Sequence, residues 1–280
     1  MITINNITEF LAQEKLSTDY WCNMPEKFYH STTPIGQSNL CKFKESPAHY
    51  ISARSKVFKE SPAMKLGTAI HCNILEPHLF AKNYAVMPKI IKSKKSVAYK
   101  EWADMFAVDK IVIDETFFNK VLACTSSVMS SQFADYFVGG NSEQVGVATH
   151  EETGFRQKIR IDKYHKDQKV IVDLKTTGKP VASKQYVNSM ADFNYHVQAA
   201  YYSDVAAQID GDEHEYLIIA VETEPPFPVI MYMPSDTTIM QGRKNYRKYM
   251  TELAECSDTG IFPGYKDTIR EFDLPKWAYD

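Results

Sequence analysis

Apolar residues recur at every second position between Gln144 and Thr176, and this alternation constrains the fold more than any other feature of the chain. A period of two is typical of β-strands that bury one face. Turns are expected near Glu151–Gly154 and His165–Gln168, where polar residues interrupt the pattern. The segment therefore predicts consecutive strands joined by short turns.

Alternation also assigns the charged residues of these strands to faces. Ile159 and Ile161 point one way in the middle strand, whereas Lys158, Arg160 and Asp162 point the other way. The charged side of this strand is therefore available for chemistry or for solvent.

The next predicted strand, Lys169–Lys175, places Asp173 and Lys175 on the face opposite Val172. Because the two strands follow each other closely, we expect them to be neighbours in the sheet. Asp162, Asp173 and Lys175 would then share one face.

The remainder of the chain mixes helical and strand-like patterns. Helices are predicted over residues 63–75, about 99–108, about 114–132, 186–208 and 235–255. Tyr216–Glu222 has the composition of a buried strand, and Val229–Met233 is its predicted partner. Pro88–Ala98 is basic and aperiodic, so a loop is expected there. No repeat or linker interrupts these elements, which favours one α/β domain.

Composition excludes several classes of protein. No stretch approaches the ~18–20 apolar residues that a membrane helix needs, and the first residues do not resemble a secretory signal. The five cysteines are scattered and odd in number, which disfavours a disulfide framework or a zinc knuckle. We therefore expect a cytoplasmic protein that does not bind a membrane.

The net charge of −3 leaves the partner undecided, since phosphate contacts favour basic surfaces. Two stretches are basic although the net charge of the whole chain is negative: the lysine run 89–100 and the cluster Arg243–Lys248. Either could be a solvated face. The lysine run could equally grip DNA or be disordered.

Asp162 and the sequence Asp173-Leu174-Lys175 carry the strongest chemical signal. Two neighbouring carboxylates repel each other, so such a pair commonly binds a cation, and oxygen ligands suit Mg²⁺ or Mn²⁺. Lys175 shares the face of Asp173 and can reach a metal-bound water. The three residues could therefore support metal-assisted phosphodiester hydrolysis, although two strands joined by a salt bridge would show the same pattern.

Other polar residues precede and follow this group along the chain. His71 lies on the first long predicted helix, and Gln198 and Tyr202 lie one turn apart on a later one, where they share a face. Glu143 stands just before the predicted sheet. Each alone is compatible with ordinary packing.

Taken in order, these residues resemble the motif succession of the RecB-like branch of PD-(D/E)XK nucleases. The succession runs Gly67-x-Ala69-x-His71, Glu143, Arg160-Ile161-Asp162, Asp173-Leu174-Lys175-Thr176-Thr177 and Gln198-x-x-x-Tyr202. The resemblance implies an α/β restriction-endonuclease-like core, with a central mixed β-sheet flanked by helices.

Within that branch the chain most resembles the nuclease domain of the RecE (exonuclease VIII) family. The segments that carry this likeness are Ser46–Tyr50, Leu66–Pro77, Thr153–Arg156, Asp173–Thr177, Tyr195–Gln198, Tyr201–Asp204 and Leu274–Ala278. The likeness implies a single nuclease domain over residues 27–280. Residues 1–26 form an N-terminal segment without an assigned role.

The resemblance also implies a metal site. His71, Asp162, Asp173 and the backbone carbonyl of Leu174 would hold Mg²⁺, with Mn²⁺ as a substitute, and Glu143 would face a second metal. Iron–sulfur relatives carry three clustered cysteines after the last motif. Only Cys256 lies there in this chain, so no iron–sulfur cluster is expected.

Further roles follow from the same resemblance. Lys175 would activate the attacking water, assisted by Gln198 and Tyr202. The candidate DNA contacts are Lys158, Arg160, Thr176, Thr177, Lys92, Lys94 and Lys95.

Members of the RecE family degrade linear double-stranded DNA processively from 5′ ends and leave 3′ single-stranded tails. They form ring-like homotetramers and work beside a RecT-type single-strand annealing protein in homologous recombination, often on phages. Three alternatives are a structure-specific or single-strand DNA nuclease, a DNA-binding recombination protein with a vestigial site, and a magnesium-dependent small-molecule hydrolase.

Overall fold

A mixed β-sheet forms the centre of the computed structural model, which describes residues 2–15, 18–55, 59–265, 269, 271–275 and 278. The sheet has eight strands in the order β1-β2-β6-β7-β8-β9-β10, and β3 pairs with β7 beside this path. The strands are β1 (Ile2–Thr3), β2 (Tyr20–Asn23), β3 (Ile35–Gly36), β6 (Asn141–Thr149), β7 (Arg156–His165), β8 (Val170–Thr177), β9 (Glu215–Glu222) and β10 (Val229–Tyr232). β8 and β9 are parallel, whereas β6, β7 and β8 are antiparallel, so the mixed α/β class is confirmed.

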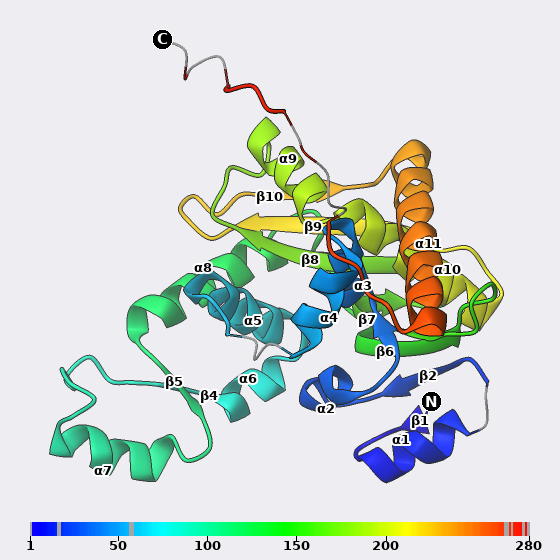
Figure 1. Cartoon of the computed structure of the whole chain (residues 1–280). Coiled ribbons are helices and arrows are strands. Elements are labelled where there is room, and N and C mark those ends of the chain that lie inside the picture. The colour runs from blue at the N-terminus through cyan, green and yellow to red at the C-terminus, as the bar shows by residue number, and fades with distance from the viewer. Residues whose placement is uncertain are drawn as a thin grey trace.

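Helices cover both faces of the sheet (Figure 1). One layer consists of α3 (Gln37–Leu40), α4 (Pro47–Ser55), α10 (Tyr195–Asp210) and α11 (Asp236–Thr259), and the other of α5 (Pro62–Leu75) and α8 (Glu115–Met129). The remaining helices are α1 (Ile7–Glu14), α2 (Glu26–Ser31), α6 (Pro77–Asn83), α7 (Val97–Phe106), α9 (Lys184–Asp192) and two 3₁₀ turns, Cys41–Lys44 and Ala134–Phe137. No helix among the described residues is long and apolar enough to cross a membrane.

The alternation predicted for β8 is confirmed. Val172 and Leu174 are buried against α5 and α8, whereas Ile171 belongs to the core beneath α10. Asp173 and Lys175 follow Ile171 at intervals of two and therefore face α10.

The ladder between β7 and β8 ends one residue pair before Asp162 and Asp173, which were predicted to share a face. β7 pairs with β8 only where Lys163–His165 meets Val170–Val172. Beyond that point the strands diverge, and β3 pairs with the first half of β7. Ile161 and Tyr164 both belong to the core beneath α10 although they are three residues apart, so the alternation of β7 breaks between them. Asp162 consequently lies in the gap where β7 and β8 separate, beyond the pair Lys163 and Val172. We call this gap the fork.

A break in the predicted helix 186–208 is a correction. The segment forms two helices, α9 and α10, because Asn194 adopts a left-handed backbone with φ 59°. Asparagine tolerates this conformation better than most residues. The break starts a new helix at Tyr195, beneath the fork.

A small lobe projects from the body of the molecule (Figure 1). It contains the parallel strands β4 (Tyr84–Val86) and β5 (Ile111–Ile113) together with α7. The Ser96 side chain caps α7 by accepting a hydrogen bond from the Tyr99 N–H, so the lysine-rich loop ends slightly earlier than predicted.

The N-terminal segment continues the sheet. β2 pairs with β6, and β1 pairs with β2. Arg156 on β7 forms ion pairs with Glu14 of α1 and with Asp19, which precedes β2. The first residues therefore extend the same sheet that carries Asp162.

A close contact between α10 and α11 sets the position of both helices. A Cβ atom added to Gly242 on α11 would lie 2.0 Å from the His196 carbonyl oxygen on α10. Real atoms do not approach so closely, so only glycine permits this crossing.

We expect Gly242→Ala to lower the free energy of unfolding by about 1–3 kcal/mol, because the helices must separate. This loss opposes the higher helix propensity of alanine, about 1 kcal/mol. Chemical denaturation of purified protein measures the difference. Gly264→Ala is the control, since a Cβ there meets nothing within 4 Å. Equal stability of both variants would contradict the close crossing.

Candidate active site

Asp162 closes the fork between β7 and β8. Its Oδ2 accepts a hydrogen bond of 2.8 Å from the Leu174 N–H, and His71 Nδ1 on α5 lies 3.5 Å from the same oxygen. The N–H and C=O of one strand residue point to the same strand edge, so the Leu174 carbonyl also faces the fork. Three of the predicted metal ligands therefore meet here.

Asp173, Lys175 and Gln198 form a hydrogen-bonded triangle on the α10 side of the fork. Lys175 Nζ lies 2.9 Å and 2.7 Å from the two carboxylate oxygens of Asp173 and 3.2 Å from Gln198 Oε1. Gln198 Nε2 donates to Asp173 Oδ1 at 2.9 Å. The amide thus fixes both charged groups.

Lys175 keeps its positive charge in this setting. Burial alone would lower the pKa of its ammonium, but Asp173, Tyr195 and Asp162 together raise that pKa. The ammonium is therefore suited to orient a water or a phosphate oxygen, and it is not a proton acceptor at neutral pH.

The acidic groups of the fork are suited to a cation. Burial, followed by the charge of Asp173, raises the pKa of Asp162 to about 7. Burial lowers the pKa of His71, which leaves a neutral imidazole able to bind metal. These donors fit a hard divalent cation in kind, although no three His, Cys, Asp or Glu side chains of the described residues already form a metal-binding cluster.

Glu143 lies beside this group on β6. It adopts φ 53°, where the pairing of β6 with β7 is interrupted opposite Asp162. Burial raises its pKa to about 7, against the opposing effect of its hydrogen-bonded partner Arg160. The Nη1 atom of Arg160 is buried without a hydrogen-bond partner among the described residues.

The sequence of this chain is similar to that of a known protein family. Residues 36–273 match the family described as "PDDEXK-like domain of unknown function (DUF3799)". The chain belongs to this family. It therefore carries a PD-(D/E)XK nuclease fold, and nucleases of this type generally depend on a divalent metal.

Solved structures agree on the fold. A crystal structure from Eubacterium rectale, named "Putative exonuclease", has a TM-score of 0.63 at 13% identity over 91% of this chain and 97% of that chain. This likeness shows the shared fold alone. A structure of SSO0001 matches with a TM-score of 0.35 at 11% identity, over 88% and 87% of the two chains, which is too weak for argument. No curated protein matches the chain.

The specific RecE resemblance stays a prediction. Of its last segment, Leu274–Ala278, residues 276 and 277 lie outside the described residues. The PD-(D/E)XK assignment instead depends on the fork and on the family match.

Tyr202 lies one turn after Gln198 on α10. Its ring packs edge to face against Tyr216 on β9, with centroids 6.3 Å apart at 82°. Burial, followed by Tyr29, Asp173 and Asp162, holds the pKa of Tyr202 well above its ordinary value. Its hydroxyl consequently stays protonated and can donate a hydrogen bond.

Lys158 lies in an environment that favours a structural role over the predicted phosphate contact. Only 5% of the residue is exposed. Its ammonium donates to the carbonyls of Tyr29 and Thr32 and to the Thr32 hydroxyl, at 2.7–2.9 Å. The lysine thereby joins β7 to the last turn of α2 and to Thr32, which follows it.

The other predicted DNA contacts divide into two groups. Thr176 and Thr177 lie half-buried at the end of β8, where Thr176 Oγ1 lies beneath Gly67 of α5. Lys92, Lys94 and Lys95 are exposed in the segment between β4 and α7, which belongs to the projecting lobe (Figure 1). The structure therefore does not bring these lysines together with Asp162.

Tyr195 is a residue of the site that the motif analysis did not assign. Its ring centroid lies 4.7 Å from Lys175 Nζ, a cation–π contact. Its place at the start of the helix bearing Gln198 was the available signal. The aromatic face stabilises the ammonium, so Tyr195 is expected to position Lys175.

We expect Tyr195→Leu to lower kcat for metal-dependent DNA cleavage about 2- to 30-fold, from loss of a contact worth ~0.5–2 kcal/mol. Tyr195→Phe retains the aromatic face and should remain near the wild-type rate. KM should change little in either variant. Steady-state assays on linear DNA measure both constants. Equal losses in both variants would show that the ring face is not the cause.

Proposed function

We propose that this chain is a Mg²⁺-dependent exonuclease of double-stranded DNA, with Mn²⁺ as a substitute. It would degrade linear DNA processively from 5′ ends and produce 3′ single-stranded tails for recombination by strand annealing. The observation that carries the proposal is the fork, where His71 Nδ1 lies 3.5 Å from Asp162 Oδ2 and Asp162 accepts the N–H of Leu174, the residue between the ion-paired Asp173 and Lys175.

The residues of the fork have complementary tasks in this reaction. His71, Asp162, Asp173 and the Leu174 carbonyl would hold the divalent cation, which supplies charge neutralisation at the phosphate and a more acidic water. Lys175 orients the attacking water. Gln198 holds Lys175 and Asp173 in register through hydrogen bonds of 3.2 Å and 2.9 Å.

The proposed DNA contacts begin at Arg160. Its guanidinium lies close to Asp162 in the chain, and Nη1 has no hydrogen-bond partner among the described residues. A phosphate oxygen would satisfy that donor and offset the cost of leaving it buried, about 1–3 kcal/mol. Thr176 and Thr177 supply further polar groups at the end of β8.

The proposal includes an assembly. A ring-like homotetramer would enclose the DNA, so that a channel can be basic although each chain has a net charge of −3. A RecT-type annealing protein is the proposed partner that receives the single-stranded tail.

We expect Mg²⁺ to permit degradation of linear duplex DNA but not of a closed circle. Release of a 5′-end label before a 3′-end label, measured on denaturing gels, would support the proposed polarity, and EDTA should stop the reaction. Cleavage of the circle would exclude the requirement for an end. No cleavage with Mg²⁺ or Mn²⁺ would overturn the nuclease proposal for this chain.

We expect Asp173→Asn and Lys175→Met each to lower the cleavage rate by about 10²–10⁴-fold. The first variant should also weaken Mn²⁺ binding in the absence of DNA, measured by electron paramagnetic resonance. Lys184→Met, at an exposed lysine of α9, removes the same charge and should leave both properties unchanged. Circular dichroism checks folding. Full activity of the Asp173 or Lys175 variant would contradict the site.

A further inference from the structure

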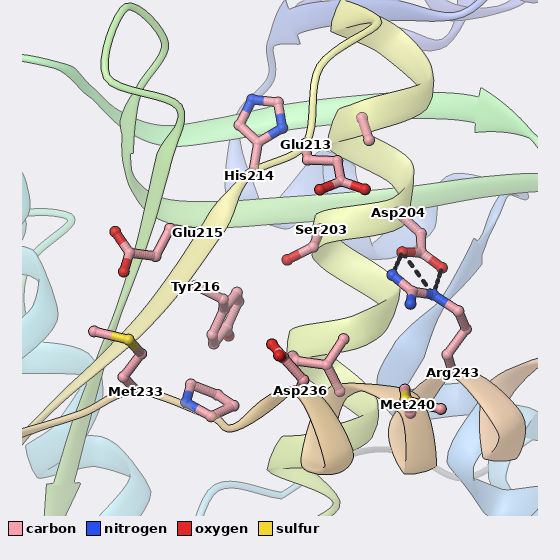
Figure 2. A pocket seen from close by; sticks show the side chains of 13 residues that line it. Ser203, Asp204, Glu213, His214, Glu215, Tyr216, Met233, Asp236, Met240 and Arg243 are labelled. Atoms are coloured by element: carbon pink, nitrogen blue, oxygen red, sulfur yellow. Dashed lines mark hydrogen bonds and ion pairs between the residues drawn. The ribbon is translucent and has the colours of Figure 1, made fainter.

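A second gap in the sheet lies on the far side of β9. The pairing of β9 with β10 ends where Ile218 meets Tyr232, so Glu215–Leu217 has no β10 partner. A cavity of about 480 Å³ opens at this place between β9, α10 and α11 (Figure 2). We call it the β9 notch; it is lined by Ser203, Glu213, Glu215, Tyr216, Asp236 and Ile239, among others.

The main chain of Tyr216 faces the notch without a partner. Successive strand residues direct their N–H and C=O groups to opposite edges. The Glu215 N–H bonds to Lys169 on the β8 side, and the Glu222 N–H bonds to Pro228 on the β10 side. Tyr216 has the same parity as Glu222. Its N–H and C=O therefore point toward the notch, and no backbone bond to them is found there among the described residues.

A buried polar side chain also lacks a partner in the notch. Ser203 on α10 is only 8% exposed, and its Oγ makes no hydrogen bond within the described part of the chain. Figure 2 shows this hydroxyl directed into the cavity. A buried hydroxyl without a partner is costly, which points to a ligand with a polar group at this position.

The charge of the notch selects a cation. Glu213, Glu215 and Asp236 form no ion pair with any described lysine or arginine. Asp204, by contrast, is already neutralised by Arg243, which lies 2.6 Å away. The acidic walls repel nucleic acid, so the notch is not a further DNA site.

Apolar side chains complete the wall opposite β9. Met233 and Met240 are 61% and 64% exposed, and Pro234 and Ile239 lie between them. Methionine adapts its shape to a partner more readily than branched side chains do. A long side chain with an aliphatic stem and a cationic end matches this combination of apolar and acidic groups.

We propose that the β9 notch binds an extended segment of a partner protein that presents a lysine or arginine side chain. The segment adds a short strand beside Glu215–Leu217, and the main chain of Tyr216 supplies its hydrogen bonds. The cationic side chain enters the cavity between Glu215 and Asp236, with Ser203 Oγ as an additional polar contact. This inference does not depend on the nuclease proposal.

A fluorescein-labelled five-residue peptide tests the proposal by fluorescence anisotropy, in the absence of DNA. It contains valine and threonine around a central lysine. We expect it to bind at least tenfold more tightly than the same peptide with a central glutamate. Methylation of its backbone amides should weaken binding by a similar factor, because strand pairing needs the N–H groups.

Protein variants locate the binding. The double variant Glu215→Gln with Asp236→Asn should bind the lysine peptide at least tenfold more weakly. Glu151→Gln with Glu152→Gln is the matched control, since it removes two exposed charges at the β6–β7 turn and should change nothing. Thermal unfolding confirms that each variant is folded.

Three results would overturn the proposal: no binding of the lysine peptide, equal binding of the glutamate peptide, or an unchanged affinity in the Glu215/Asp236 variant. The proposal would also be overturned if n-butylammonium displaced the labelled peptide at the same concentration as the unlabelled peptide does. In that case the notch recognises a small amine and not an extended segment.

Discussion

The divergence of β7 from β8 is the constraint on which the site depends. Main-chain groups beyond the paired region lose their ladder partners, and a buried donor without a partner costs about 1–3 kcal/mol. The Leu174 N–H avoids this cost by donating to Asp162. The Asp162 carboxylate therefore stabilises the fork and is also a candidate metal ligand, so one residue has both a structural and a chemical role.

The carboxylates of Asp162 and Glu143 are buried at the fork. Burial is the main cause that raises the pKa of both Asp162 and Glu143 to about 7, from ordinary values of 3.8 and 4.5. For an acid whose pKa is raised in the folded state, the contribution to stability is present at low pH and is lost as pH rises toward the folded pKa. At neutral pH these carboxylates therefore destabilise the fold. Arg160 and Lys175 offset part of this effect, and a bound cation would offset more.

The sequence predicted those parts of the site that depend on local patterns. Val172 and Leu174 alternate with Asp173 because each face of β8 meets a different helix layer, and alternation records that directly. The fork itself had no local signal. It forms because β3, distant in sequence, pairs with β7 where β8 has departed. Burial of Lys158 escaped prediction for the same reason, since its acceptors belong to Tyr29 and Thr32.

The fork and the β9 notch arise from the same event, a strand that leaves its neighbour. At the fork, the unpaired main chain of Leu174 is satisfied by Asp162 from within the molecule. At the notch, β10 turns into α11 through Pro234, which has no N–H to offer, and the main chain of Tyr216 stays unpaired. Where the chain closes the gap with its own carboxylate, as at Asp162, that carboxylate is available as a candidate metal ligand. A gap that it leaves open at the edge of a sheet, with acidic and apolar walls, is suited to a partner that brings the missing strand and charge.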